Sequence, residues 1–158
     1  MKQSAIVYLF ALLTGCASTT GFNSYQDQDL TLSEAQIHKL THDAVGRIEA
    51  NYPPAKTLIS LEQDKGTFGA ELEHQLRAKG YGVKTPLEKK GKESMEIEGE
   101  VVPDFTTFRY EVKHYAADHV LLVVQASDGF QANRVYKKGV LDLQAKTPFT
   151  EMNAGRNE

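Results

Sequence analysis

Early in the chain, apolar side chains recur every three or four positions, so that they share one face of a helix. Two capping pairs fit the start of this helix, either Thr31 with Glu34 or Ser33 with Gln36. Tyr52-Pro53-Pro54 ends it, because proline lacks an amide hydrogen and biases the preceding residue toward extended backbone. The apolar face consists of Ile37, Leu40, Ala44 and Ile48, with Val45 at its edge.

A second helix is predicted over residues 68–79, within a strand–helix–strand unit. Gly69 would let this helix approach a sheet closely, and Gly80 fits the left-handed position that ends a helix. Strands are predicted before it, over residues 56–62, and after it, from Tyr81. Its apolar side chains are spaced by four residues: Phe68, Leu72 and Leu76.

Past the second helix the period changes to two, which is the period of strands. Apolar residues alternate with glutamates over residues 95–101, and alternation returns over residues 108–115. Residues 119–126 are almost wholly apolar and predict a central strand, and Asp128-Gly129 predicts a type I′ hairpin turn into a partner strand over residues 131–138. The whole pattern predicts an α+β domain in which a small, antiparallel-rich sheet packs with two helices.

The N-terminus has the pattern of a bacterial lipoprotein signal. Lys2 precedes an apolar run over residues 6–13, which is too short for the roughly 20 residues of a membrane-spanning helix. Leu13-Thr14-Gly15-Cys16 then forms a lipobox, in which small side chains fit the signal peptidase and the thiol accepts diacylglycerol. The alternative is an ordinary secretory signal with Cys16 incidental. The place of the only cysteine directly after the apolar run favours the lipobox.

These patterns divide the chain into four segments. Residues 1–15 are expected to be a cleaved signal peptide, and residues 16–30 the lipidated cysteine with a polar, flexible tether. Residues 31–143 are expected to form the α+β periplasmic domain. Residues 144–158 are expected to be a flexible C-terminal tail.

Composition narrows the range of partners and reactions. The 158-residue chain has a formal charge of −3 and no block of like charge that indicates direct binding to nucleic acid. With Cys16 lipidated, no thiol remains for a disulfide or a nucleophile. Ala17 stands where an aspartate usually retains a lipoprotein in the inner membrane of a Gram-negative cell. By similarity to sorted lipoproteins, we expect the outer membrane.

His38 and His42 are weak candidates for a metal site. Two histidines four residues apart on a helix can share a metal ion, and Glu49 projects to the same side. However, Lys39 stands where a zinc protease motif has its catalytic glutamate, and these polar side chains flank the apolar face, as boundary residues usually do. We therefore predict no metal and no cofactor.

No other constellation has the pattern of an enzyme site. Ser127-Asp128 with His114 or His119 would resemble a hydrolase set, but no Gly-x-Ser-x-Gly motif is present and the turn already explains the aspartate. The glutamates at 96, 98 and 100 and the lysines within 89–92 are typical of solvated surfaces. The alternatives are contacts with a basic partner and with anionic headgroups. We predict a protein without enzymatic activity.

Five segments of the chain carry a resemblance to a known family. They are the lipobox, Tyr52-Pro53-Pro54-Ala55-Lys56-Thr57, Phe68-Gly69, Leu76-Arg77-Ala78-Lys79-Gly80-Tyr81, and a hairpin with Asp128-Gly129 and Arg134 to Tyr136. Together they resemble the conjugal transfer lipoproteins of the TrbH type, which accompany the mating-pair-formation genes of conjugative plasmids. The family pattern leads us to expect a tryptophan after a late proline, whereas Phe149 follows Pro148 here.

The resemblance implies a non-enzymatic component of a conjugative type IV secretion (mating pair formation) apparatus. Cys16 would anchor it in the outer membrane, facing the periplasm, with the bilayer and other envelope-complex subunits as partners. Whether it forms a homo-oligomer within the assembly stays open. One alternative is an envelope-assembly or peptidoglycan-synthesis accessory lipoprotein. Another is a periplasmic ligand-binding lipoprotein or enzyme, which would need a pocket with convergent polar groups.

Overall fold

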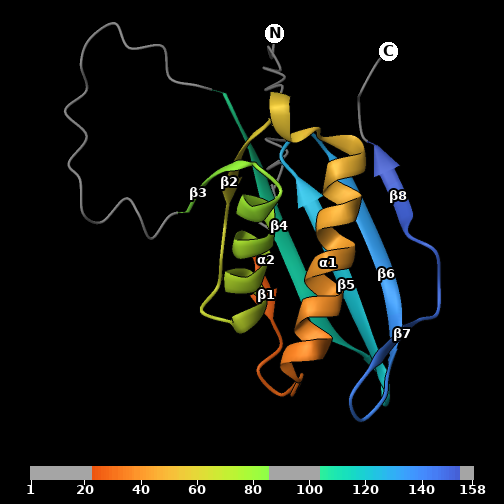
Figure 1. Cartoon of the computed structure of the whole chain (residues 1–158). Helices are drawn as coiled ribbons and strands as arrows, with labels where there is room; N and C mark the ends of the chain where they lie inside the picture. The colour runs from red at the N-terminus through yellow and green to blue at the C-terminus, as the bar shows by residue number, and fades with distance from the viewer. Residues whose placement is uncertain (1–22, 86–103, 154–158) are drawn as a thin grey trace, which may run out of the picture.

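A computed structural model of the chain describes residues 23–85 and 104–153. Two α-helices lie side by side on one face of an eight-stranded sheet, and the described residues place no helix on the opposite face (Figure 1). Along the chain the elements are β1 (Tyr25–Gln26), α1 (Glu34–Asn51), a 3-10 helix η1 (Pro54–Lys56), β2 (Leu58–Leu61), α2 (Thr67–Ala78), β3 (Gly82–Lys84), β4 (Phe105–Ala116), β5 (His119–Ala126), β6 (Phe130–Lys138), β7 (Leu143–Ala145) and β8 (Thr150–Asn153).

The sheet is mixed, with the strand order β3-β2-β4-β5-β6-β7. In addition, β1 pairs with β4 and β8 pairs with β6. The pairings of β2 with β3, of β2 with β4 and of β1 with β4 are parallel, and the remaining ones are antiparallel. The prediction of an antiparallel-rich sheet is therefore wrong. Neighbouring strands joined by a crossover helix run in the same direction, and α2 joins β2 to β3 in this way.

Helix α1 begins with a capping box at the second of the two predicted pairs. The hydroxyl oxygen of Ser33 accepts the Gln36 amide hydrogen at 3.3 Å, and the Ser33 amide donates to Gln36 Oε1 at 3.0 Å. The helix ends at Asn51, with Tyr52 as its C-cap, as the proline pair predicts. Its predicted apolar face is buried against the sheet and α2.

Helix α2 confirms the predicted roles of both of its glycines. Gly80 has a φ of 89° and accepts the left-handed conformation that other residues avoid. Its amide donates to the Arg77 carbonyl at 2.9 Å, and the amide of Tyr81 donates to the Leu76 carbonyl at 3.2 Å, which completes a Schellman motif. Gly69 is buried against the hydroxyl group of Tyr110 on β4, so the helix approaches the sheet closely there.

The hydrophobic core lies between the helix layer and the sheet and is rich in aromatic rings. Tyr52 meets Phe108 and Phe130 edge to face, with ring centroids 5.0 and 5.4 Å apart. Phe68 from α2 lies 4.8 Å from the ring of Tyr110 on β4. These contacts fix both helices on one face of the sheet.

Two segments predicted to be flexible contribute strands in the structure. Tyr25–Gln26 pairs in parallel with β4, and Leu30 is buried in the core, so residues 24–30 are not a free tether. The hydroxyl of Ser24 donates to the Glu62 carbonyl at 2.5 Å and extends this contact. At the other end of the chain, β8 pairs with β6 within the predicted tail. Both segments are held by long-range pairing, which their polar local composition does not reveal.

The Asp128-Gly129 hairpin forms, but its turn is not of type I′. Gly129 has a φ of 91°, whereas no described residue other than glycine has a positive φ, so Asp128 does not meet the type I′ requirement. The Gly129 amide donates to the Ala126 carbonyl at 3.1 Å. The loop is therefore a tight turn followed by a left-handed glycine. The predicted signal peptide, the lipobox and the strand predicted over residues 95–101 lie outside the described residues.

Candidate functional site

The two candidate metal ligands lie on the solvent side of α1. The rings of His38 and His42 are stacked, with centroids 6.4 Å apart, and line a groove of about 400 Å³ between α1 and α2. Glu49, the third candidate, is paired with the ammonium group of Lys79 at 2.9 Å. Within residues 23–85 and 104–153, no group of three or more His, Cys, Asp or Glu side chains is placed to hold a metal ion.

The residues considered as a hydrolase set, Ser127-Asp128 with His114 or His119, do not form a common site. His119 begins β5 and Ser127 follows its end, so they lie at opposite ends of a strand of roughly 26 Å. The hydroxyl oxygen of Ser127 accepts the amide hydrogen of Thr107, and His119 lies 2.7 Å from Asp118. The three described grooves are not lined by His114, His119 or Asp128. The turn interpretation of Asp128 is the one that the structure supports.

A polar cluster around Asp43 ties α1 to β6. The Asp43 carboxylate accepts hydrogen bonds from Tyr136 Oη at 2.9 Å, Arg134 Nη1 at 3.2 Å and Lys39 Nζ at 2.7 Å. Burial raises the pKa of Asp43, but the hydrogen bonds from Lys39 and Tyr136 and the nearby cations outweigh burial, and the net pKa is lowered. For Tyr136, burial and the charge of Asp43 raise the pKa of the hydroxyl far above its ordinary value. The carboxylate therefore stays charged inside the fold.

Arg134 extends this cluster to the C-terminal segment. Its Nε donates to the Thr147 carbonyl at 2.9 Å, and its guanidinium lies 5.1 Å from the centre of the Phe149 ring. Arg47 of α1 lies 5.9 Å from the same ring and is paired with Glu151 of β8. Phe149 thus lies near two arginines at the position where the family pattern led us to expect a tryptophan, and it keeps an aromatic surface for the cations.

A second polar connection joins the end of α1 to the sheet. The hydroxyl of Tyr52 donates to both carboxylate oxygens of Asp128, at 2.8 and 2.9 Å. The hydroxyl of Tyr81 donates to the Tyr52 carbonyl at 2.6 Å. Burial, followed by the charge of Glu49, raises the pKa of Tyr81 to about 12. Tyr52, at the end of α1, is therefore hydrogen-bonded both to the β5–β6 hairpin turn and to the residue that precedes β3.

A third connection links β4 to the start of α2. The hydroxyl of Tyr110 donates to Asp64 Oδ1 at 2.6 Å and accepts the Asp64 amide hydrogen at 3.2 Å. Burial, followed by the hydrogen bond with Asp64, raises the pKa of this hydroxyl well above its usual range. Gly69 packs directly on the same hydroxyl.

These three connections involve most of the segments that carry the family resemblance. Tyr52, Gly69, Tyr81, Asp128 and Arg134 each hold a helix, a turn or the C-terminal segment in place. Their roles in this structure are to stabilise the fold. The hydrogen bonds of Asp43 and Asp64 with buried tyrosine hydroxyls were not predicted from the sequence. The available signal was the placement of Tyr110 and Tyr136 at inward positions of alternating strands, where a buried hydroxyl needs a partner.

A family model described as "Conjugal transfer protein TrbH" matches residues 18–158. The chain belongs to the TrbH family. Neither a curated protein nor a solved structure matches it significantly.

Membership in the TrbH family makes the chain a component of conjugal transfer and confirms the resemblance found in the sequence. The matched region includes residues 18–30 of the segment that the sequence pattern had assigned to a tether, and the whole predicted tail. Within the described residues, no helix is long and apolar enough to cross a membrane.

Proposed function

We propose that this TrbH-family chain is a lipid-anchored, non-enzymatic subunit of a conjugative type IV secretion apparatus. It would be attached to the outer membrane and face the periplasm. The observation that carries the proposal is the family match over residues 18–158. The lipobox Leu13-Thr14-Gly15-Cys16, with Ala17 after it, supports the anchor and its destination.

The anchor would hold the chain on the bilayer for its lifetime. Each buried methylene of an acyl chain contributes about 0.8 kcal/mol, and two or more chains give stable attachment where a single one does not. Attachment raises the concentration of the domain near membrane-bound subunits without any further contact. A weak protein interface is then sufficient for assembly.

The linker between anchor and domain is short in this proposal. Ser24 is already hydrogen-bonded to the Glu62 carbonyl at 2.5 Å, so only residues 17–23 separate Cys16 from the sheet. Seven residues span at most about 25 Å even when fully extended. The domain would therefore work close to the bilayer, within about half of the reach that a tether to residue 30 would allow.

The non-enzymatic role in this proposal is supported by what three carboxylates do, of which Asp43 and Asp64 are half-buried and Asp128 is exposed. Asp43, Asp64 and Asp128 each accept a tyrosine hydroxyl that stabilises the packing of helices on the sheet. These three carboxylates are thus hydrogen-bonded in contacts that stabilise the fold. The proposed role is attachment and presentation of surfaces to other subunits.

The test compares the location and partners of wild-type protein with those of Cys16→Ser and Ala17→Asp, all with the same C-terminal tag. Wild type should incorporate labelled palmitate, fractionate with the outer membrane and co-purify with conjugation-channel subunits. Cys16→Ser should lose the label and the membrane. Ala17→Asp should keep the label but move to the inner membrane.

Two outcomes would contradict different parts of the proposal. Outer-membrane recovery of Cys16→Ser at the wild-type level would contradict the anchor. Recovery of wild type with cell-wall synthesis proteins, and not with channel subunits, would contradict the role in the transfer apparatus.

A further inference from the structure

We propose that one end of the domain inserts apolar side chains into the bilayer surface, as a second and non-covalent membrane contact. The contact is made by an apolar tip, defined as Tyr115 next to the β4–β5 turn with Val140 and Leu141 in the β6–β7 loop. This inference rests on the proposed function, because the lipid on Cys16 is what keeps the bilayer near the tip.

The tip contains the most exposed large apolar side chains of the described residues. Val140 is 92% exposed, Leu141 75% and Tyr115 64%. The β4–β5 turn and the β6–β7 loop lie at the same end of the sheet (Figure 1). The Lys138 amide donates to the Asp118 carbonyl at 2.7 Å and joins the two connections. Three exposed apolar groups therefore project from a single end of the domain.

Hydrogen bonds hold the backbone of the loop that carries Val140 and Leu141. The Gly139 amide donates to the Asp142 carbonyl at 3.0 Å and closes the loop. Gln36, which is 1% exposed, donates from its side-chain amide to the carbonyls of Gly139 at 3.0 Å and Asp142 at 3.1 Å. Because Gln36 also belongs to the capping box of α1, the loop is fixed to the start of that helix. The two apolar side chains are thus held outward and do not collapse onto the core.

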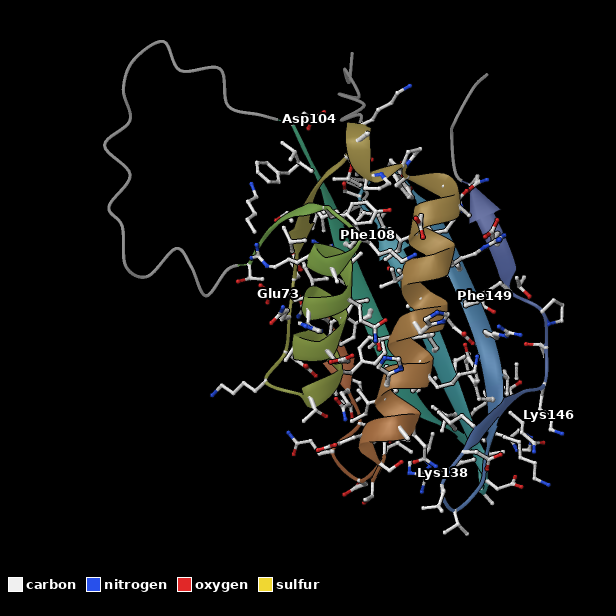
Figure 2. The ribbon with its side chains drawn as sticks, viewed as in Figure 1. Glu73, Asp104, Phe108, Lys138, Lys146 and Phe149 are labelled. Carbon is white, nitrogen blue, oxygen red and sulfur yellow. The ribbon has the colours of Figure 1, made fainter. Side chains whose placement is uncertain are left out.

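Lysines lie beside the tip, together with the carboxylates of Asp118 in the β4–β5 turn and Asp142 in the β6–β7 loop. Lys113 pairs with Glu111 at 2.8 Å and Lys137 with Asp118 at 3.6 Å. Within the described part of the chain, Lys138 and Lys146 have no carboxylate oxygen within 4.0 Å. Figure 2 shows both at the end of the sheet that lies away from Asp104.

This combination of groups fits a lipid surface with anionic headgroups. Lysine stems lie along apolar surface while their ammonium groups reach the headgroup layer, and each cation near an anionic surface adds attraction. Exposed aliphatic side chains that project from a loop can enter the acyl boundary without a preformed pocket. The apolar tip is therefore complementary to the bilayer in polarity, and Lys138 and Lys146 beside it favour anionic headgroups.

The geometry of the anchor allows this contact. Tyr25 pairs with Glu111, which precedes Tyr115 by four residues along β4, or about 13 Å. The linker over residues 17–23 spans up to about 25 Å. Cys16 and the tip can therefore reach the same bilayer.

The test places a fluorescent reporter at the tip of the lipidated protein. Acylation blocks the only native cysteine, so Val140→Cys provides a single thiol for an environment-sensitive dye. The matched control is Ser127→Cys, which is also exposed but lies at the opposite end of β5. Both proteins, purified from membranes, are reconstituted into phosphatidylethanolamine and phosphatidylglycerol vesicles with or without brominated acyl chains.

We expect the emission of the dye at position 140 to shift to the blue and to lose most of its intensity with brominated lipid. The dye at position 127 should show neither effect. Unchanged emission at 140, on protein that stays on the vesicles, would overturn the tip contact while leaving the anchor intact. A shift at 140 only after channel subunits are added would also overturn it, in favour of a protein partner. Two dyes per chain, with loss from the vesicles, would show an unacylated Cys16 and contradict the anchor itself.

Discussion

Gly69 of α2 lies directly against the hydroxyl group of Tyr110 on β4, and a Cβ atom at position 69 would overlap that oxygen. Tyr110 is fully buried, and its hydroxyl donates to Asp64 at 2.6 Å, so it is not free to move away. The distance between helix and sheet is therefore set by the absence of a side chain.

This contact predicts opposite effects for two glycine substitutions. Gly69→Ala should lower the free energy of unfolding by about 1–3 kcal/mol, because the added methyl overpacks the contact with Tyr110. Gly46→Ala is the matched control: its Cβ would meet nothing within 4 Å, so it should raise that free energy by about 0.5–1 kcal/mol through better helix propensity. Urea unfolding of both variants measures the difference. Equal stabilisation by the two would mean that α2 does not approach β4 this closely.

The hydrogen bonds from Tyr52 to Asp128 predict that removing the Tyr52 hydroxyl lowers the free energy of unfolding more than removing the hydroxyl of an exposed tyrosine. Tyr52→Phe removes the donor that lies 2.8 and 2.9 Å from the two carboxylate oxygens, and it should cost about 1–3 kcal/mol. Tyr115→Phe changes the same atoms on a side chain that is 64% exposed, and it should cost less than about 0.5 kcal/mol. Similar losses in the two variants, measured by urea unfolding, would argue against this connection.

The cluster at Asp43 predicts an acid-dependent loss of stability. Because the folded-state pKa of Asp43 is lowered, its contribution is fully present above the unfolded-state value of about 3.9. It is lost as the pH falls through the folded-state pKa. Asp43→Asn should therefore be less stable than wild type at pH 7, and the difference should narrow below about pH 4. Unfolding curves recorded between neutral and acidic pH would contradict this if the two proteins stayed equally far apart throughout.

The sequence pattern predicted local elements better than their pairing. The helical period placed α1 and α2 to within a few residues, and the roles of Gly69 and Gly80 followed from their positions alone. Parallel pairing was missed because alternation of apolar residues does not encode strand direction. The two residues of β1 were missed because their stability comes from β4 and from a bond that Gln26 Oε1 accepts from the Phe68 amide, 42 residues away.

The polar cluster around Asp43 was also not predicted, because its residues lie far apart in the sequence. Asp43 lies 91 residues from Arg134 and 93 from Tyr136, so no local motif contains them. The sequence did indicate the family, and the family model matches residues 18–158. Cys16 and the residues before it remain a prediction from the lipobox pattern, since they lie outside the described residues.

Conjugation frequency in a donor that lacks this protein shows whether transfer needs the lipid anchor. The donor is complemented with wild type, with Cys16→Ser, or with Ala17→Ser, which keeps the thiol and a small side chain beside it. We expect Ala17→Ser to restore transfer, whereas Cys16→Ser should leave it at the level of the deletion although the domain is folded and present in the periplasm. Transfer at the wild-type frequency by Cys16→Ser protein released from the membrane would show that the anchor is not needed.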